Sequence, residues 1–248
     1  MIEQILKTTE GKIRVAIPAD ISELTLAQLI QLQEAPELND LKAISILSGV
    51  TLQDLQNVTN VEDLHFFTDC IFLLSHQLKN LHNEKALPKQ VCFTIDGKMR
   101  KVNVIQNLSV EPAGAFMTAG EVIGSEIQDF IKQHGEEDWQ ERFNPSLKAC
   151  CQVLAQYFYC RATGQKYDEY KAEEFTEQVK QLKVTEALPV ARYFFTVYPR
   201  LSTTKTGFWH RMLRHWRKKQ VYTPSASSNT SIRSTRWQAA TSLNGMTS

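Results

Sequence analysis

The clearest structural signal in this chain is the stretch Phe93-Thr-Ile-Asp-Gly-Lys-Met-Arg-Lys-Val-Asn-Val104. Its Asp96-Gly97 pair predicts a two-residue hairpin loop, because a type I′ turn needs positive φ at both central positions. β-Favouring residues flank this turn, so the sequence predicts a β-hairpin over about residues 90–105. A similar stretch, Lys7-Thr-Thr-Glu-Gly-Lys-Ile-Arg-Val-Ala-Ile17, predicts another hairpin over about residues 2–17.

Helical patterns follow the first hairpin. Apolar residues from Leu24 to Leu32 recur at helical spacing behind a Thr25 cap, which predicts a helix there. Thr51 and Asp54 have the spacing of a capping box and predict the start of a short helix. Two further helices are predicted from apolar periodicity, over about residues 40–48, ended by Gly49, and over about residues 61–80.

Helical patterns also follow the second hairpin. Thr118 and Glu121 have capping-box spacing and predict a helix that ends near Gln133. Asn144-Pro145 predicts a cap with proline in the first turn of a strongly apolar helix, which stops near Gly164. Two more helices are predicted, over about residues 168–182 and 186–198.

These elements predict an α+β fold with a mostly helical body and two small antiparallel β-hairpins, followed by a C-terminal amphipathic helix and an extended tail. We expect a hairpin-plus-helices unit over residues 1–88, a second such unit over residues 89–201, and a basic C-terminal arm over residues 202–248. The two hairpins have similar sequences, so an internal duplication is a hypothesis for the first two units.

Charge is divided unevenly along the chain. All 27 acidic residues lie in positions 1–186, together with 18 of the 28 basic ones, whereas the remaining ten basic residues follow Glu186. The net charge of +1 therefore combines an acidic body with a basic C-terminal part. This division favours an adaptor that presents a charged arm to another macromolecule.

The arm contains a basic amphipathic pattern over residues 207–219. Aromatic and apolar residues fall on one side of the predicted helix, and arginine, lysine and histidine cover the other. The candidate partner-binding residues are Phe208, Trp209, Arg211, Met212, Arg214, Trp216, Arg217 and Lys218. Such a helix suits an acidic protein groove, nucleic acid, an anionic membrane surface, or packing on the chain's own body. The acidic body argues against a dedicated nucleic-acid binder, because it repels phosphates.

Composition favours a cytosolic protein without a membrane span. The longest apolar run, Cys70–Leu74, is about five residues, whereas a spanning helix needs about 20. Met1-Ile-Glu-Gln4 lacks the basic start and apolar stretch of a secretory signal. The five cysteines form no Cys-x-x-Cys pair, so we expect free thiols in the core, with zinc or disulfide bonding as the alternative.

No sequence motif indicates catalysis. The chain has no Gly-x-Ser-x-Gly elbow, no phosphate-cradling glycine loop and no His-Glu-x-x-His pattern. His65 and Asp69 have the spacing of two neighbouring ligands on a helix, but a third ligand is not evident. We therefore expect a non-enzymatic protein without catalytic, cofactor-binding or metal-binding residues.

Three stretches resemble the small tail-assembly proteins of tailed bacteriophages. They are Ile21-Ser-Glu-Leu-Thr-Leu-Ala-Gln-Leu-Ile-Gln-Leu-Gln33, the following Lys42-Ala-Ile-Ser-Ile-Leu-Ser-Gly-Val-Thr-Leu-Gln-Asp-Leu55, and Leu188-Pro-Val-Ala-Arg-Tyr-Phe-Phe195. The resemblance covers about residues 11–80 and 186–198. It includes neither the second hairpin nor the tryptophan-rich arm.

The resemblance implies a tail-assembly chaperone, a non-enzymatic protein that binds the tape-measure protein while the tail tube polymerises around it. Its partners would be phage structural or assembly proteins, or further copies of the chain, and it would act in the host cytoplasm. The alternative is a structural virion component, such as a head–tail connector, ring or tail protein, whose arm contacts neighbouring subunits.

Overall fold

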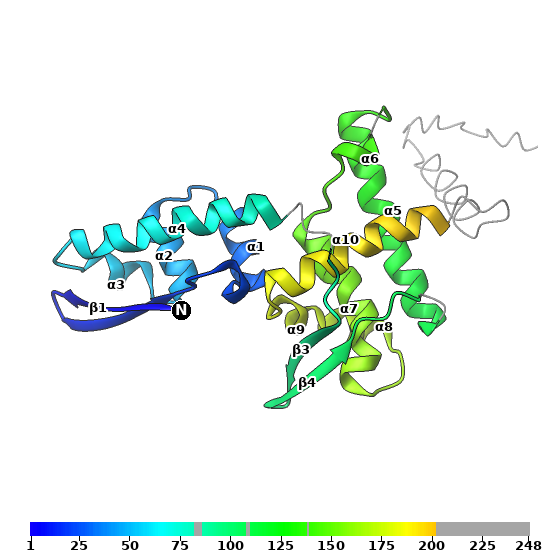
Figure 1. Cartoon of the computed structure of the whole chain (residues 1–248), viewed down its shortest axis with the longest axis horizontal. Coiled ribbons are helices and arrows are strands. Elements are labelled where there is room, and N and C mark those ends of the chain that lie inside the picture. The colour runs from blue at the N-terminus through cyan, green and yellow to red at the C-terminus, as the bar shows by residue number, and fades with distance from the viewer. Residues whose placement is uncertain (82–85, 108–109, 138, 202–248) are drawn as a thin grey trace, which may run out of the picture.

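The computed structural model describes residues 1–81, 86–107, 110–137 and 139–201 (Figure 1). It is mostly helical, with 60% helix, and contains two two-stranded antiparallel sheets, which confirms the predicted fold class. The predicted arm, with its eight candidate residues, lies outside the described residues. The proposed boundary at residue 88 stays a prediction.

The first hairpin packs on the helices that follow it. Its strands are β1 (Ile2–Thr8) and β2 (Gly11–Ile17), paired from Ile2 with Ile17 to Thr8 with Gly11. The inward side chains of Leu6, Val15 and Ile17 are fully buried. The turn is fixed to the loop before the next long helix, because the Thr9 N–H donates to the Asn57 carbonyl over 3.0 Å.

The second hairpin has the predicted turn. Its strands are β3 (Gln90–Ile95) and β4 (Lys98–Asn103), and φ is 50° at Asp96 and 71° at Gly97, as a type I′ turn requires. Phe93 anchors the hairpin, with its ring centroid 5.2 Å from that of Phe158 and from that of Phe175. Both predicted hairpins are therefore confirmed.

Five helical segments form the rest of the N-terminal unit. The predicted caps are confirmed: Thr25 and Gln28 make a reciprocal capping box, the Thr51 hydroxyl accepts from the Asp54 N–H, and Gly49 ends a helix at φ 75°. The segments are η1 (Ile21–Glu23), α1 (Leu26–Glu34), α2 (Asp40–Ser48), α3 (Leu52–Gln56) and α4 (Glu62–Leu81).

Six described helices form the rest of the C-terminal unit, and α7 lies at their centre. Most residues of α7 are buried, since α5, α8, α9, α10 and the hairpin all contact it. Gly164 ends α7 in the left-handed region at φ 74°, as expected. The helices are α5 (Ala113–His134), α6 (Trp139–Arg142), α7 (Leu147–Thr163), α8 (Glu169–Glu174), α9 (Thr176–Lys180) and α10 (Val184–Leu201).

Two predicted helix starts are wrong. Helix α5 begins five residues before Thr118, behind Pro112, because the added first turn buries Ala115. The Thr118 hydroxyl instead lies 3.2 Å from that of Tyr167. Helix α7 is capped by Ser146, whose hydroxyl accepts from the Ala149 N–H, so Asn144-Pro145 precedes the helix. The helix expected over 168–182 is divided into α8 and α9 at Phe175.

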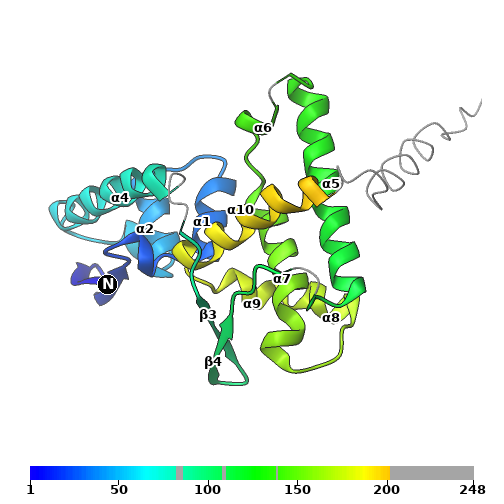
Figure 2. The same ribbon diagram turned by 45° about the vertical axis from the view of Figure 1, so that its right-hand side comes forward.

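The start of α10 lies beside η1 and α1 (Figure 2), and a short strand-like junction joins the two units there. The Leu26 N–H donates to the Leu182 carbonyl over 3.0 Å, and the Val184 N–H donates to the Leu24 carbonyl over 2.9 Å. These bonds flank an isolated antiparallel bridge between Thr25 and Lys183. All four apolar residues are buried, so the junction is part of a hydrophobic core that continues through both units.

The described cysteines are free thiols. Cys70, Cys150 and Cys151 are buried as expected, but Cys92 is exposed because it lies on the outward face of β3. Among the described helices, none has the length and apolar character to cross a membrane.

A candidate binding groove between the two units

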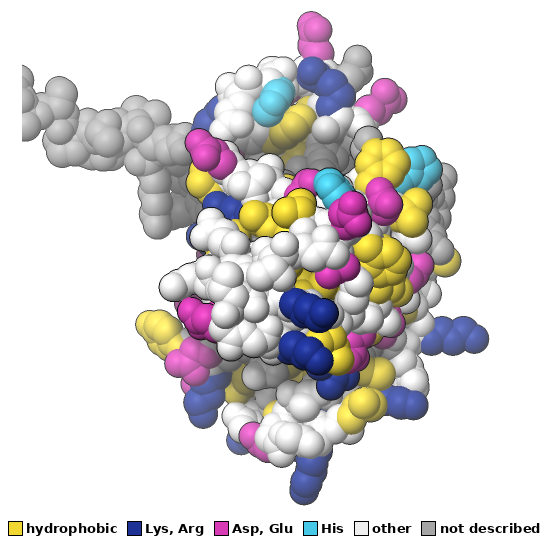
Figure 3. Space-filling model, turned by 90° about the vertical axis from the view of Figure 1, so that its left-hand side faces the viewer, with side chains coloured by type: hydrophobic (Ala, Val, Ile, Leu, Met, Phe, Trp, Pro, Cys, Tyr) yellow, Lys and Arg dark blue, Asp and Glu magenta, His cyan; other side chains and the backbone are white. Residues whose placement is uncertain are grey.

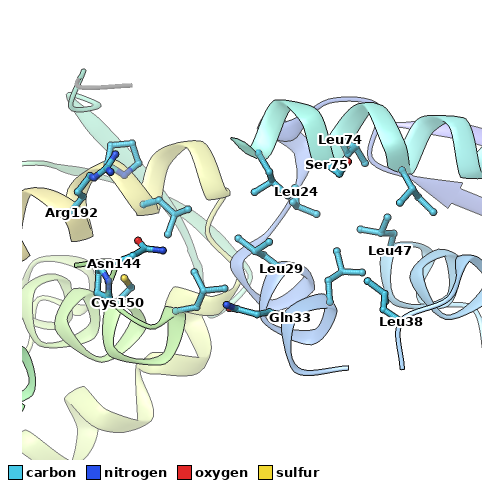
Figure 4. A pocket seen from close by; sticks show the side chains of 17 residues that line it. Leu24, Leu29, Gln33, Leu38, Leu47, Leu74, Ser75, Asn144, Cys150 and Arg192 are labelled. Atoms are coloured by element: carbon cyan, nitrogen blue, oxygen red, sulfur yellow. The ribbon is translucent and has the colours of Figure 1, made fainter. Parts of the chain in front are cut away.

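An apolar groove of about 420 Å³ lies where the two units meet (Figure 4). One wall comes from the N-terminal helices and the other from the start of α7 and of α10. Nine leucines line it, which makes it more apolar than an ordinary surface depression. The lining residues are Leu24, Leu29, Leu32, Gln33, Leu38, Leu47, Ile71, Leu74, Ser75, Leu78, Asn144, Pro145, Leu147, Cys150, Leu188, Pro189 and Arg192.

Helical periodicity explains the N-terminal wall. On α4, Ile71, Leu74 and Leu78 are spaced by three and four residues, so their side chains share one face of the helix. On α1, Leu29 and Leu32 are spaced by three residues and face the same groove. These residues are only partly covered by the chain itself, apart from buried Leu74, which leaves apolar surface available to a ligand.

The opposite wall carries the polar groups that could orient a ligand. Asn144 and Cys150 face Leu29 and Gln33 across the groove, while Arg192 brings a guanidinium group from α10 (Figure 4). Among the described lining residues there is no carboxylate. The groove therefore suits an apolar segment that carries polar groups along its edge.

The chemistry of Cys150 favours binding rather than covalent reaction in the groove. Burial raises the pKa of the Cys150 thiol well above its usual range, with smaller contributions from Cys151 and Glu126. A thiol attacks as its thiolate, and a raised pKa keeps Cys150 protonated near neutral pH.

A separate polar cluster lies against α7. The Glu111 carboxylate, with its side chain only 2% exposed, forms an ion pair with Arg161. Arg161 Nη1 also donates to the Tyr157 hydroxyl over 2.8 Å, and its guanidinium lies 4.5 Å from the centroid of the Tyr157 ring. The Tyr157 hydroxyl in turn bonds both backbone groups of Ile105 at 2.7 Å.

Burial raises the pKa of Glu111 to about 7, and Arg161 opposes this shift. The cluster fixes the segment after the second hairpin to α7, which is a structural role. Sequence reasoning missed it because Glu111 and Arg161 are 50 residues apart. The single available signal was the isolated arginine in the apolar run that forms α7.

The eight candidate residues of the arm lie outside the described part of the chain, so the cluster and the groove are defined by described residues alone. His65 and Asp69 lie exposed on α4, and the described residues contain no group of three His, Cys, Asp or Glu side chains able to hold a metal ion. Comparison with protein-family models, curated proteins and solved structures finds no match to this chain.

Proposed function

We propose that this chain is a non-enzymatic binding protein of phage morphogenesis, which holds an apolar segment of a partner protein during tail assembly. The leucine-lined groove between the two units carries the proposal. The resemblance of residues 11–80 and 186–198 to tail-assembly proteins supplies the partner class, with the tape-measure protein as the first candidate. The site of action would be the host cytoplasm.

The groove has the properties of a surface that binds a helix. Its volume falls within the range of roughly 300–1,000 Å³ that is typical of ligand sites. An amphipathic helix inserts apolar side chains spaced by three and four residues into such a groove. Exposed Glu34 and Glu37 flank the lining residues Gln33 and Leu38, so basic residues beside the apolar stripe would favour binding.

Substitution in the groove tests the proposal. The full chain would be mixed with the tape-measure protein of the same phage genome, and complex formation measured by isothermal titration calorimetry. Leu29→Glu and Leu188→Glu should weaken binding by about tenfold or more, because each places a charge in an apolar site. The matched control is Leu52→Glu, at a residue of α3 that is 38% exposed and outside the groove. Unchanged affinity in both groove variants would contradict the proposal.

A second candidate is a structural virion component whose arm contacts neighbouring subunits. The observation that favours it is an apolar surface on the outer side of α4, away from the groove. Mass spectrometry of purified particles separates the two functions. A chaperone should be absent from mature virions, whereas a structural subunit should be present in a fixed ratio to the other tail proteins.

A further inference from the structure

Helix α4 has a second apolar face that the chain itself does not cover. Phe66, Phe72 and Leu73 are 50%, 71% and 60% exposed, whereas Phe67, Cys70 and Leu74 on the inner side are buried. We call the exposed side the outer α4 face and define it by His65, Phe66, Asp69, Phe72, Leu73 and His76. Hydrophobic side chains lie among acidic and histidine side chains on this end of the molecule (Figure 3).

The inner side alone fixes α4 in the fold. A helix of a monomeric globular unit needs one apolar stripe, and three large apolar side chains on the other side expose surface that water solvates poorly. Phe66 and Leu73 are seven residues apart, so they form a ridge about two turns long, with Asp69 between them. Such a ridge is the expected footprint of another helix.

We propose that the outer α4 face binds the basic arm of a second copy of this chain, through the predicted helix over residues 207–219. Charge complementarity identifies this occupant. Exposed Glu62 and Asp69 lie on the same side of α4 as Phe66 and Leu73. The arm has no acidic residue, and its apolar stripe is bordered by arginines and lysines.

The two apolar stripes also match in length. Phe208 to Trp216 spans eight residues, about 12 Å of helix, and Phe66 to Leu73 spans seven, about 10.5 Å. With Trp209, Met212 and Trp216 against the ridge, Arg217 lies next to the edge of the apolar stripe and can pair with Glu62 or Asp69. Arg214 lies on the opposite side of the helix and adds only to the positive charge of the arm. Large aromatic side chains with flanking arginines are typical of the centre of an interface.

The arm of the same molecule cannot cover the whole length of this face. Helices α4 and α10 extend from η1 in opposite directions (Figures 1 and 2). Both helices are bonded close to η1: the Gln77 side chain of α4 accepts from the Ile21 N–H, and the Val184 N–H of α10 donates to the Leu24 carbonyl. Phe66 lies 11 residues from Gln77, about 16 Å of helix, and α10 adds about 26 Å in the other direction. The six residues between Leu201 and Phe208 span at most about 25 Å.

Each copy offers one arm and one outer α4 face, so two copies can exchange arms in a closed dimer, or successive copies can bind head-to-tail. Heterologous contacts of this kind produce rings when the rotation closes and filaments when it does not. The inference does not depend on the groove, since none of the residues of the outer α4 face lines it.

Mixing two defective full-length variants tests the proposal. Phe72→Glu disrupts the outer α4 face and leaves the arm unchanged, whereas Trp216→Glu disrupts the apolar stripe of the arm and leaves the outer α4 face unchanged. By light scattering after size exclusion, each variant alone should associate at least about tenfold more weakly than the natural chain. An equal mixture should form dimers and no larger species, because one intact contact remains between the two variants.

The control is Met99→Glu, which changes a residue that is 73% exposed on β4 and should leave association unchanged. Raising salt from about 0.05 M to about 0.5 M should weaken association of the natural chain. A natural chain that stays monomeric, association that survives Trp216→Glu, or a mixture that stays monomeric would each overturn the proposal. If the groove variants lose partner binding but still self-associate, the result supports a contact through the outer α4 face that is separate from the groove.

Discussion

Leu24 and Val184 form a backbone hydrogen bond of 2.9 Å between the Leu24 carbonyl and the Val184 N–H. This bond places the first leucine of the groove beside the start of α10, which contributes Leu188 and Arg192 to the opposite wall. The groove therefore lies beside a junction in which two segments far apart in sequence pair as short strands.

Leu26→Ala should lower the free energy of unfolding by about 2–4 kcal/mol, because Leu26 is fully buried at the junction and the change leaves a cavity. Unfolding in urea, followed by circular dichroism, should remain a single transition, since both units share this core. Leu52→Ala, at a partly exposed site on α3, is the control and should cost less than about 1 kcal/mol. Two separate transitions in the natural chain would contradict a shared core.

The Glu111–Arg161 cluster should make stability depend on pH. Glu111 has a pKa of about 7 in the folded chain and its ordinary value of 4.5 when unfolded. Between these values the folded state holds one proton more than the unfolded state. The stabilisation that protonated Glu111 contributes to the folded state is therefore complete below about pH 4.5. It is lost as the pH rises from there through 7, by up to about 1.4 kcal/mol per pH unit.

Urea titrations at several pH values, on the natural chain and on Glu111→Gln, measure this effect. The variant stays neutral at all pH values, so the difference in stability between the two proteins should grow from pH 5 to pH 7.5. The two proteins share every other titratable group, whose contributions cancel from this difference. A difference that is independent of pH would contradict the raised pKa of Glu111.

Gly114→Ala should destabilise the chain despite its position inside α5. An added Cβ would overlap the Tyr167 ring, with the Cδ1 atom only 2.8 Å away. The ring cannot move freely, because its hydroxyl lies 2.7 Å from Gln156 Oε1. We expect a loss of about 1–3 kcal/mol, as for overpacking. In a helix with open space at this position, the same change would stabilise the folded chain by up to about 1 kcal/mol. The melting temperature of the variant, measured by thermal unfolding, shows which effect is larger.

Thiol labelling should distinguish the five cysteines. Cys92 is exposed, whereas burial raises the pKa of Cys151 to about 11 and shields its sulfur. Iodoacetamide followed by peptide mass spectrometry should modify Cys92 first in the native chain, and Cys92→Ser should remove this fast phase. Rapid labelling of Cys150 or Cys151 would show that the central helix opens.

The sequence predicted the features that depend on local chemistry. The Asp96-Gly97 turn and the Thr25 and Thr51 caps follow from the conformations of a few neighbouring residues, and all three are confirmed. The start of α5 was wrong because burial of Ala115 against the central helices outweighs the capping signal at Thr118.

The groove could not be predicted from periodicity alone. The leucines of α1 and α4 were recognised as helix faces, but their spacing does not say which face meets α10 or leaves a space. The contact between Leu26 and Leu182 and that between Glu111 and Arg161 join residues distant in sequence, and no local pattern encodes them. The arm residues remain predictions, since they lie outside the described part of the chain.

The junction also has a consequence for synthesis on the ribosome. Glu23 and Lys183, whose bond of 2.9 Å closes the junction, are 160 residues apart, so Leu24 and Leu26 lack their final cover until α10 has been translated. At roughly 5–20 residues per second, this leaves the two leucines open for about 10–30 s in every nascent chain. During that interval a ribosome-associated chaperone has its best opportunity to bind, and premature termination before α10 yields a fragment that exposes them permanently.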